Sequence, residues 1–382
     1  MSKRLKYGMI GGGIGSFIGP VHRMAAEMDG LAKLVCGAFS SDPDRSVESG
    51  LQLGLDRNRI YPDYEAMIRK EKELPPEERM DFVSIVTPNY LHFDPARLAL
   101  ENGFHVICDK PLTKTLEEAE QLGRLSEDNR LLFGLTHTYT GYPMVKKARS
   151  LVQNGSLGKI HKVMVTYLQG WLTPYPEGAG NKQALWRTNP DYTGKTSTMG
   201  DIGTHAENLI SYITGLKILE ISAQLNTLIK PRKMDDDGSV MLRYEQDVAG
   251  TILVSQVATG EENNVTLRVY GEKGGLEWNQ EEPNTLILRW VNKPMEIYRS
   301  GAGITGINTG NRLPAGHPEG FIEAFANVYK NFEEAVLDRK NRKNFPVNHY
   351  DFPTVFDGIQ GMKFLEKVVE SSASTQKWIP FQ

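Results

Sequence analysis

Two things are scarce in this 382-residue sequence: cysteine and long hydrophobic runs. The two cysteines, Cys36 and Cys108, lie in apolar runs typical of strands, which predicts buried thiols in a reducing, cytoplasmic compartment. No apolar run approaches the roughly 20 residues of a membrane-spanning helix. Residues 1–10 lead into glycines and not into an apolar segment, so we expect no signal peptide and no membrane partner.

The sequence also lacks a large excess of either positive or negative charge. Lys and Arg number 44 against 47 Asp and Glu, so the chain lacks the basic surface that attracts nucleic acids or anionic membranes. Internal repeats and low-complexity tails are absent, and the acidic run at 235–237 is interpreted as a solvated turn. With 382 residues the chain exceeds one ordinary hydrophobic core, which predicts two domains.

The first 140 residues alternate strand-like and helix-like segments. Thr115 and Glu118 form a capping-box pair at the start of one helical stretch. Fully apolar strands separated by helices predict an α/β domain over 1–140, built as a doubly wound parallel sheet of the Rossmann type. The predicted strands cover 5–11, 31–39, 81–88, 104–111 and 130–139, with helices such as 21–30, 94–103 and 115–129 between them.

The second part of the chain, 141–382, has a different pattern. β-branched and aromatic residues alternate with polar ones, which predicts hairpins in a large, open, mostly antiparallel sheet of an α+β domain. An open sheet needs a cover on the face that its helices leave bare, so we expect a homodimer or homotetramer formed through it. The strand-like segments are 159–170, 219–229, 239–259, 263–279 and 285–291. The helical ones are 204–215, 320–340 and a last helix over 353–373 that is able to pack back on the first domain.

Glycines gather behind the first predicted strand, in "GGGIGSFIGPVH". Backbone N–H groups of a strand-to-helix turn bind pyrophosphate, and glycines let the chain approach it, which favours nucleotide binding over a merely flexible turn. Counting G-x-G-x-x-G from Gly11 reaches Gly13 and then Ser16, so the loop departs from the strict fingerprint. Ile14 and Gly15 complete the candidate phosphate-binding residues.

Further cofactor contacts are expected at the ends of the next strands. The second strand ends at Ser40 and Ser41, where a carboxylate would favour NAD; serines with Arg45 nearby accept either cofactor. We therefore expect NAD and leave NADP open. In "VTPNYLH" a turn places polar groups along the cofactor crevice, unless it is an ordinary proline turn that opens the next helix. The candidates there are Thr87, Asn89 and His92.

Asp109 and Lys110 end another strand, in "VICDKPLT", directly before Pro111. A buried ammonium needs a partner or must lose its proton. Lys110 is therefore paired with Asp109, exposed to solvent, or a cation in the crevice beside the reacting carbons. The last interpretation makes Lys110 catalytic and places both residues at the cofactor.

A second polar group of residues lies in "MGDIGTHAENLISYITG". On helical spacing Asp201, His205, Asn208 and Tyr212 share one face. Such a stripe is usually solvated, but a histidine one turn from an aspartate is also an oriented general base. The pair could ligate a metal only with a third protein ligand, and no motif such as H-E-x-x-H supplies one, so we expect no metal.

Aromatic and hydrogen-bonding side chains concentrate between these motifs. Trp rings stack on sugars, and Arg, His and Tyr bond hydroxyls, so the concentration predicts a substrate cleft. The candidates are His137, Tyr139, Trp171, Trp186, Arg187 and Asn208, with His317 in a covering loop.

The motifs "GMIGGGIGSFIGPVH", "TPNYLH", "CDKPLT", "WR" and "GDIGTHAEN" occur in the order found in the Gfo/Idh/MocA family of glucose–fructose oxidoreductases and inositol dehydrogenases. The chain resembles this family over nearly its whole length. The resemblance implies NAD(P)-dependent oxidation or reduction of a sugar, anhydrosugar or cyclitol hydroxyl. It also implies that His205 takes the hydroxyl proton, that Lys110 polarises the oxygen, and that Asp201 fixes the geometry.

The sequence departs from the family pattern in three places. Asp109 replaces the glutamate of E-K-P, and Asn208 stands where an aspartate is common. The glycine loop carries extra residues: aligned on His22, Gly19 takes the third-glycine position, which leaves Ser16 as an added hydroxyl donor toward the phosphates.

Two other functions are compatible with the resemblance. One is a redox-assisted glycosidase that returns its NAD unchanged. The other is a non-catalytic sugar or NAD sensor, which would need none of Lys110, Asp201 and His205.

Overall fold

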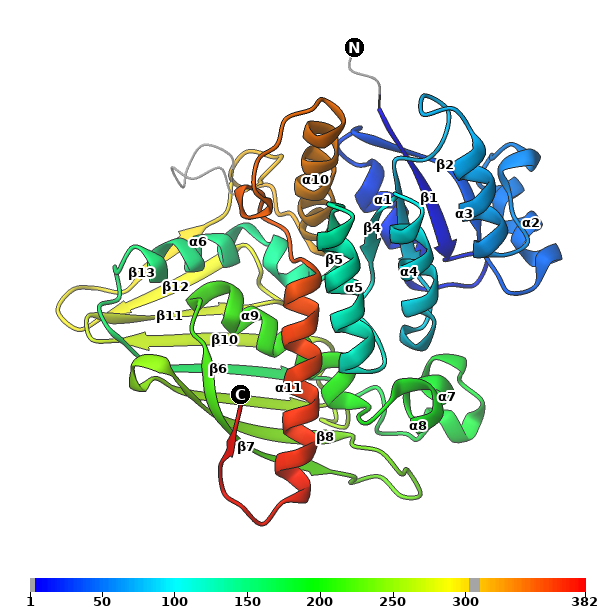
Figure 1. Ribbon diagram of the computed structural model, residues 1–382. Helices are drawn as coiled ribbons and strands as arrows, with labels where there is room; N and C mark the ends of the chain where they lie inside the picture. The colour runs from blue at the N-terminus through cyan, green and yellow to red at the C-terminus, as the bar shows by residue number, and fades with distance from the viewer. Residues whose placement is uncertain (1–3, 302–309) are drawn as a thin grey trace. The chain divides into compact units, whose positions relative to one another are not determined.

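Residues 4–301 and 310–382 are described by the computed structural model, which divides the chain into two units (Figure 1). Met1–Gly141 and Phe321–Ile359 form the first unit, and Tyr142–Gly320 and Gln360–Gln382 form the second. The first unit therefore includes α10 (Phe321–Lys340) and the start of α11 (Val355–Ala373), which follow the second unit's large sheet in the sequence.

The first unit is built on a five-stranded sheet in the order β2-β1-β3-β4-β5, with every neighbouring pair parallel. β3 is buried along its whole length, which requires cover on both faces. The predicted doubly wound parallel sheet is confirmed, and the carboxyl ends of β1 and β3 flank the switch point at which such sheets bind ligands. The elements are β1 (Leu5–Gly11), β2 (Ala32–Ala38), β3 (Phe82–Val86), β4 (His105–Cys108), β5 (Phe133–Leu135), α1 (Ile18–Glu27), α2 (Pro43–Gln52), α3 (Tyr64–Glu73), α4 (Phe93–Glu101) and α5 (Leu116–Asp128).

Local signals set the start of α5. Thr115 Oγ1 accepts a hydrogen bond from Glu118 N, and the Glu118 carboxylate accepts one from Thr115 N, both at 3.3 Å. The capping box predicted from the sequence is therefore present.

Helix α10 completes the core of the first unit. Phe325, Tyr329 and Phe332 belong to the same buried cluster as Tyr7 and Phe82. Phe82 stacks on Tyr7 with ring centroids 5.4 Å apart and meets Phe332 edge to face at 5.3 Å. The three α10 residues share one stripe at helical spacing, so this stripe holds β1 and β3 from a distant part of the sequence.

The second unit is built on a nine-stranded sheet in the order β13-β12-β11-β10-β6-β9-β8-β7-β14. All neighbouring pairs are antiparallel except β6 and β9, which confirms the predicted mostly antiparallel sheet. The strands are β6 (Ile160–Leu168), β7 (Ile218–Asn226), β8 (Asp237–Tyr244), β9 (Ala249–Ser255), β10 (Asn264–Gly271), β11 (Gly274–Asn279), β12 (Thr285–Trp290), β13 (Glu296–Arg299) and β14 (Ile379–Pro380).

The two faces of this sheet differ. Along β8, Val240, Leu242 and Tyr244 are buried, whereas Met241 and Arg243 between them are exposed. Helices α6 (Pro143–Gln153) and α9 (Thr204–Thr214) pack on each other and on the buried face (Figure 1). Among the described residues, the side chains that alternate with the buried ones thus form an exposed second face of the sheet.

The acidic run at 235–237 is not the solvated turn that the sequence suggested. Asp235 and Asp236 are 6% and 0% exposed. The Asp236 carboxylate accepts a hydrogen bond from Arg232 Nη1 at 2.9 Å, and Arg232 also pairs with Glu177. The charge of Asp236 can be buried because it is paired with Arg232 and hydrogen-bonded.

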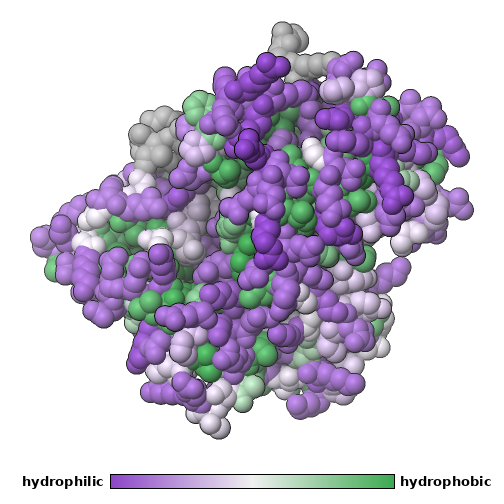
Figure 2. Space-filling view, viewed as in Figure 1, coloured by the Kyte–Doolittle hydropathy of each residue, from purple (hydrophilic) through white to green (hydrophobic). Residues whose placement is uncertain are grey.

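Cys36 and Cys108 are free and buried, as predicted. Among the described residues, no helix is both long and apolar enough to cross a membrane. Polar side chains dominate the face shown in Figure 2, and the hydrophobic areas on it are small and separate.

His105 provides a test of the first unit's stability. Its Nδ1 accepts a hydrogen bond from Leu132 N at 2.9 Å, and burial lowers its pKa from 6.5 to about 4. The unfolded chain binds this proton near pH 6.5, so the stability contributed by neutral His105 is present above pH 6.5 and is lost as the pH falls to about 4.

His105→Asn keeps an acceptor near the Nδ1 position but cannot titrate. Between pH 6.5 and 4 we expect the variant to lose less unfolding free energy than the parent, by up to about 3 kcal/mol, in urea unfolding at both pH values. His161→Asn, on the exposed part of β6, is the control, and its loss of unfolding free energy between the two pH values should equal the parent's. Equal losses in the parent and His105→Asn would contradict the expectation.

Candidate active site

The glycine loop joins β1 to α1, and its main chain at Gly12 packs closely against the main chain at Gly19. Gly11, Gly12 and Gly15 have φ of +80°, +73° and +79°, which L side chains rarely adopt. A Cβ on Gly19 would lie 2.5 Å from Gly12 Cα, so only glycine allows α1 to cross β1 there. Gly19 therefore has the close-packing role of the third glycine in a dinucleotide fingerprint. The loop and the amino end of α1 form a main-chain cradle that fits a pyrophosphate.

The other loop residues fix the cradle from within. Ser16 Oγ accepts a hydrogen bond from Gly19 N at 3.1 Å, so it caps the start of α1. Ile14 N donates to Ser49 Oγ at 3.1 Å, and Arg45 Nη2 donates to Ile14 O at 3.2 Å. Arg45 thereby ties the loop to α2.

The end of β2 presents hydroxyl groups and not a carboxylate. Ser40 Oγ accepts a hydrogen bond from Asp42 N at 3.1 Å, and Ser41 is exposed. The nearby Asp42 carboxylate is occupied as the N-cap of α2, where it accepts hydrogen bonds from Asp44 N and Arg45 N. Two serines and an arginine therefore face the position where an adenosine ribose is expected.

The turn after β3 is held by His92. Its ring is buried, with Nδ1 2.9 Å from Pro111 O and Nε2 2.8 Å from Thr87 O. Burial lowers the pKa of His92. The ring therefore links the loops that follow β3 and β4, next to the buried Asn89, and shapes that part of the crevice.

Asp109 and Lys110 stand where β4 ends. Asp109 Oδ1 accepts hydrogen bonds from Lys110 N and from Thr136 Oγ1, both at 2.9 Å, and lies 3.8 Å from His22 Nε2. Burial raises the pKa of Asp109, but His22, Lys110 and His92 outweigh it and hold the pKa well below its usual range. A carboxylate therefore fixes the main chain at Lys110.

Two further candidates lie after β5. His137 is 2% exposed, and burial together with the charge of Lys110 lowers its pKa to about 3, so it is neutral beside that lysine. Tyr139 is also buried. The first unit therefore brings Asp109, Lys110 and His137 together, as parallel strand ends should.

Sequence reasoning missed how Asp109 connects to the core. His22 Nδ1 lies 2.7 Å from Tyr329 Oη, which lies 2.7 Å from Ser84 Oγ. This buried chain joins α1, α10 and β3 behind Asp109. A histidine three residues after the loop's last glycine was the available signal, but Tyr329 lies 307 residues away in the sequence.

In the second unit, Asp201 lies in a π-helical turn, Met199–Gly203, that runs directly into α9. Its Oδ2 accepts a hydrogen bond from Gln256 Nε2 at 2.8 Å and lies 3.5 Å from Arg187 Nε. His205 is 7% exposed, and its ring centroid is 6.3 Å from that of Tyr167. The stripe that begins with Asp201 and His205 is therefore largely buried and held in place, not solvated.

Asn208 continues this stripe. It is 3% exposed, and its buried Oδ1 has no hydrogen-bond partner in the described structure. Buried polar atoms are nearly always paired, so this acceptor is suited to a bound group.

The acidic run anchors the turn that carries Asp201. The two carboxylate oxygens of Asp235 accept hydrogen bonds from Ser197 N at 2.6 Å and Met199 N at 2.7 Å. Burial raises the pKa of Asp235 to about 6, against the opposing effect of these N–H groups. Next to it, Arg232 bridges Asp236 and Glu177, and its Nη2 donates to Leu172 O, beside Trp171. No sequence motif indicated these anchors.

The predicted substrate residues of the second unit are partly assembled. Trp186 carries the Arg187 guanidinium over its ring at 4.2 Å, so this pair adjoins Asp201. Trp171 is half-buried. His317 is exposed, with its Nδ1 3.2 Å from Pro314 O, and part of the loop before it, 302–309, lies outside the described residues.

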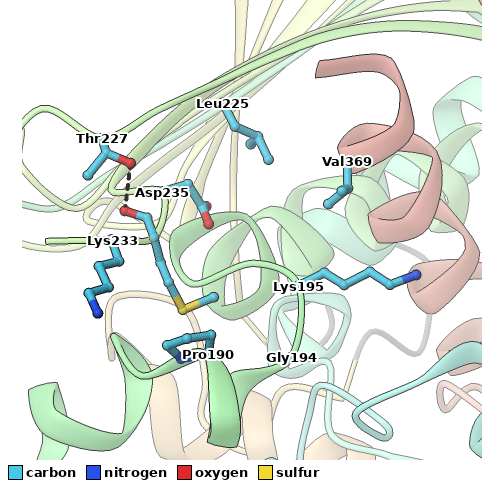
Figure 3. A pocket seen from close by; sticks show the side chains of 9 residues that line it. Pro190, Gly194, Lys195, Leu225, Thr227, Lys233, Asp235 and Val369 are labelled. Atoms are coloured by element: carbon cyan, nitrogen blue, oxygen red, sulfur yellow. Dashed lines mark hydrogen bonds between the residues drawn. The ribbon is translucent and has the colours of Figure 1, made fainter. Parts of the chain in front are cut away.

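A separate cleft of about 460 Å³ is lined in part by Asp235 (Figure 3). Lys195 and Lys233 lie on opposite sides of it, and Thr227 Oγ1 donates to Met234 O within it. Lys195 is paired with Glu366. None of the predicted site residues lines this cleft. Within 4–301 and 310–382, no group of three or more His, Cys, Asp or Glu could hold a metal ion.

Comparison with known proteins agrees with this arrangement. Residues 5–137 match the oxidoreductase family with an NAD-binding Rossmann fold, and residues 145–277 match the GFO/IDH/MocA C-terminal domain. Over its full length the chain is 31% identical to the uncharacterized oxidoreductase YfiI of Bacillus subtilis and covers 98% of it. The chain belongs to the GFO/IDH/MocA family of NAD-binding oxidoreductases, as the motifs predicted.

Further relatives have named ligands or activities, and two of them extend over nearly the whole chain. An inositol dehydrogenase homolog from Azotobacter vinelandii, in complex with NADH and myo-inositol, is 32% identical with a TM-score of 0.92, over 100% of this chain and 98% of that one. Levoglucosan dehydrogenase of Pseudarthrobacter phenanthrenivorans is 24% identical, over 99% of this chain and 98% of that protein.

Asp235→Asn tests the anchoring of the Met199–Gly203 turn. The substitution turns one acceptor oxygen into an NH₂ group that faces a main-chain N–H, at a cost of about 1–3 kcal/mol. We expect a lower melting temperature in calorimetry and a lower turnover in an assay of reduced cofactor, with the NADH affinity from a fluorescence titration unchanged. Asp237→Asn, in the same run but less buried, is the matched control. Parental turnover in Asp235→Asn would show that the turn needs no such anchor.

Proposed function

We propose that this protein is an NAD-dependent dehydrogenase that transfers a hydride between the nicotinamide and a secondary hydroxyl or ketone of a neutral sugar, anhydrosugar or inositol-type cyclitol. The observation that carries the proposal is the Asp201 carboxylate, held by Gln256 and Arg187 one helical turn before His205. The relative that binds NADH and myo-inositol supports the same chemistry.

The first unit supplies the cofactor site in this proposal. The main-chain cradle at Gly11, Gly13, Ile14, Gly15 and Gly19 binds the pyrophosphate, with Ser16 at its helix start. Ser40, Ser41 and Arg45 bind the adenosine ribose, and Thr87, Asn89, His92 and Asp109 line the crevice. Because no free carboxylate faces the ribose, NADP is accepted as well as NAD.

Residues of the chain accept and return the proton of the substrate hydroxyl. Bound NAD supplies the hydride acceptor. His205 takes the proton from the substrate hydroxyl as the carbon is oxidised, and Lys110 donates a hydrogen bond to the same oxygen. Asp201 fixes the position of the base. In the reverse direction His205 returns the proton to the ketone oxygen.

A neutral substrate suits the charges of the site. Arg187 is paired with Asp201, and Lys110 lies near the Asp109 carboxylate, so the described cations of the site have acidic partners within the chain and a neutral substrate fits them. Neutral His137 and the unpartnered Oδ1 of Asn208 offer hydrogen bonds to hydroxyls. Tyr139, Trp171, Trp186 and His317 complete the proposed substrate contacts.

The second unit also carries the proposed oligomer contact. Met241, Leu253, Tyr270 and Ile297 are large, exposed and on strands of the open sheet. We propose that this face joins copies of the chain into a homodimer or homotetramer. Sedimentation equilibrium tests it: Met241→Glu should weaken the association, and a monomeric parent protein would contradict it. The two free thiols support a cytoplasmic location.

A panel of polyols and sugars with NAD and NADP tests the function directly. We expect continuous formation of reduced cofactor, seen at its absorbance band, with a cyclitol or an anhydrosugar. A redox-assisted glycosidase would instead cleave glycosides without net reduction, and a sensor would bind sugar without turnover.

Lys110→Ala and His205→Ala test the assigned roles. Each removes a group that acts on the reacting oxygen, so we expect turnover to fall by at least about 100-fold while NAD binding is largely kept. Lys233→Ala, at the separate cleft, is the control for loss of a lysine and should keep parental turnover. Near-normal turnover of His205→Ala would exclude it as the base.

A further inference from the structure

Gln256 follows β9 directly and is 0% exposed, yet its side-chain amide makes three hydrogen bonds. Its Nε2 donates to Asp201 Oδ2 at 2.8 Å and to Gln169 Oε1 at 3.0 Å. Its Oε1 accepts from Thr198 Oγ1 at 2.9 Å. A primary amide has two N–H donors, so both are used here and the group is fully committed.

The neighbours of Gln169 determine which way the amides of Gln169 and Gln256 are oriented. Gln169 Nε2 donates to Asn263 Oδ1 at 2.7 Å, and Tyr167 Oη donates to the same atom at 2.8 Å. Gln169 therefore turns its Oε1 toward Gln256. A flipped Gln256 would place its own oxygen against Gln169 Oε1 and the Asp201 carboxylate, so the network permits Gln256 only to donate to Asp201.

The charged groups around Asp201 differ in how firmly they are held. Arg187 lies 3.5 Å from Asp201 Oδ2, is partly exposed, and also donates to Gln183 Oε1 at 2.6 Å. His205 follows one turn later on α9. Gln256 is buried and its own orientation is fixed, so it holds the carboxylate more firmly than the partly exposed Arg187 does.

We propose that Gln256 is a positioning residue: it holds Asp201 as a hydrogen-bond acceptor in the orientation that the reaction at His205 requires. The inference rests on the proposed function for its catalytic part only. The contact itself can be tested without any substrate.

Gln256→Glu is the informative substitution because a protonated carboxyl group can still donate to Asp201, whereas an ionised one repels it. We expect the turnover of Gln256→Glu to be close to the parent's at low pH and at least tenfold lower than the parent's at high pH. The loss should appear in kcat, while the affinity for NADH is unchanged. The turnover of Gln256→Ala should be lower than the parent's at every pH, because alanine has no hydrogen-bond donor for Asp201. Thr198→Val removes the hydrogen bond to Gln256 Oε1 but leaves both donations from Nε2 in place, so its loss of turnover should be smaller.

Thermal unfolding over the same pH range tests the contact alone. A glutamate beside Asp201 has a raised pKa in the folded state, so Gln256→Glu should be most stable at low pH and lose melting temperature, relative to the parent, as the pH rises. Adding Asp201→Asn supplies an amide donor to the introduced carboxylate and should recover most of that loss, but not the turnover. Gln224→Glu, an exposed position in β7 of the same sheet, is the control for added charge.

The outcomes separate the two claims. A pH-dependent loss of stability that Asp201→Asn relieves supports the contact, and its absence overturns the proposal. If the contact is present but Gln256→Glu and Gln256→Ala keep parental turnover at all pH values, the positioning role is overturned. If the parent oxidises no polyol, the proposed function fails and the catalytic role with it, while the unfolding data still decide the contact.

Discussion

The buried carboxylate of Asp235 binds two main-chain N–H groups at the start of the Met199–Gly203 turn, and the position of Asp201 in that turn depends on this constraint. A π-helical turn is a less regular support than an α-helix and needs contacts from outside to keep one shape. Asp235 fixes where the turn begins, and Gln256 fixes the carboxylate of Asp201 within it. Asp236 and Arg232 extend the support to the segment that precedes Trp186.

In the first unit, different residues fix the position of the main chain that carries Lys110. Asp109 holds the main chain of Lys110, and His22 and Tyr329 connect the region behind Asp109 to α1 and α10. In both units a carboxylate is kept buried or nearly so by several hydrogen-bond donors, which costs desolvation but leaves the carboxylate little freedom to move. The residues proposed to act on substrate therefore sit on supports that are set before substrate binds.

The local parts of this arrangement were predictable from the sequence. The glycine loop, the β/α alternation, the capping box at Thr115 and the hairpins depend on neighbours in the chain, and the structure contains them. The Gln256–Asp201 contact spans 55 residues and the Asp235–Met199 contact 36, and both require the register of β8 and β9 to be known. Asp236 and Arg232 are four residues apart, so that pairing carried a local signal, but a run of three acids is usually solvated. The aromatic stripe of α10 predicted a helix and could not show which core it joins.

Direct hydride transfer from a polyol carbon is the central claim. It is tested by incubating the protein with NAD and myo-inositol deuterated at every ring carbon, and by analysing the nicotinamide C4 position of the reduced cofactor by NMR. We predict one deuterium at C4, transferred without exchange with water. Reduced cofactor that carries only solvent hydrogen, or no reduced cofactor with any polyol tested in this way, would contradict direct transfer.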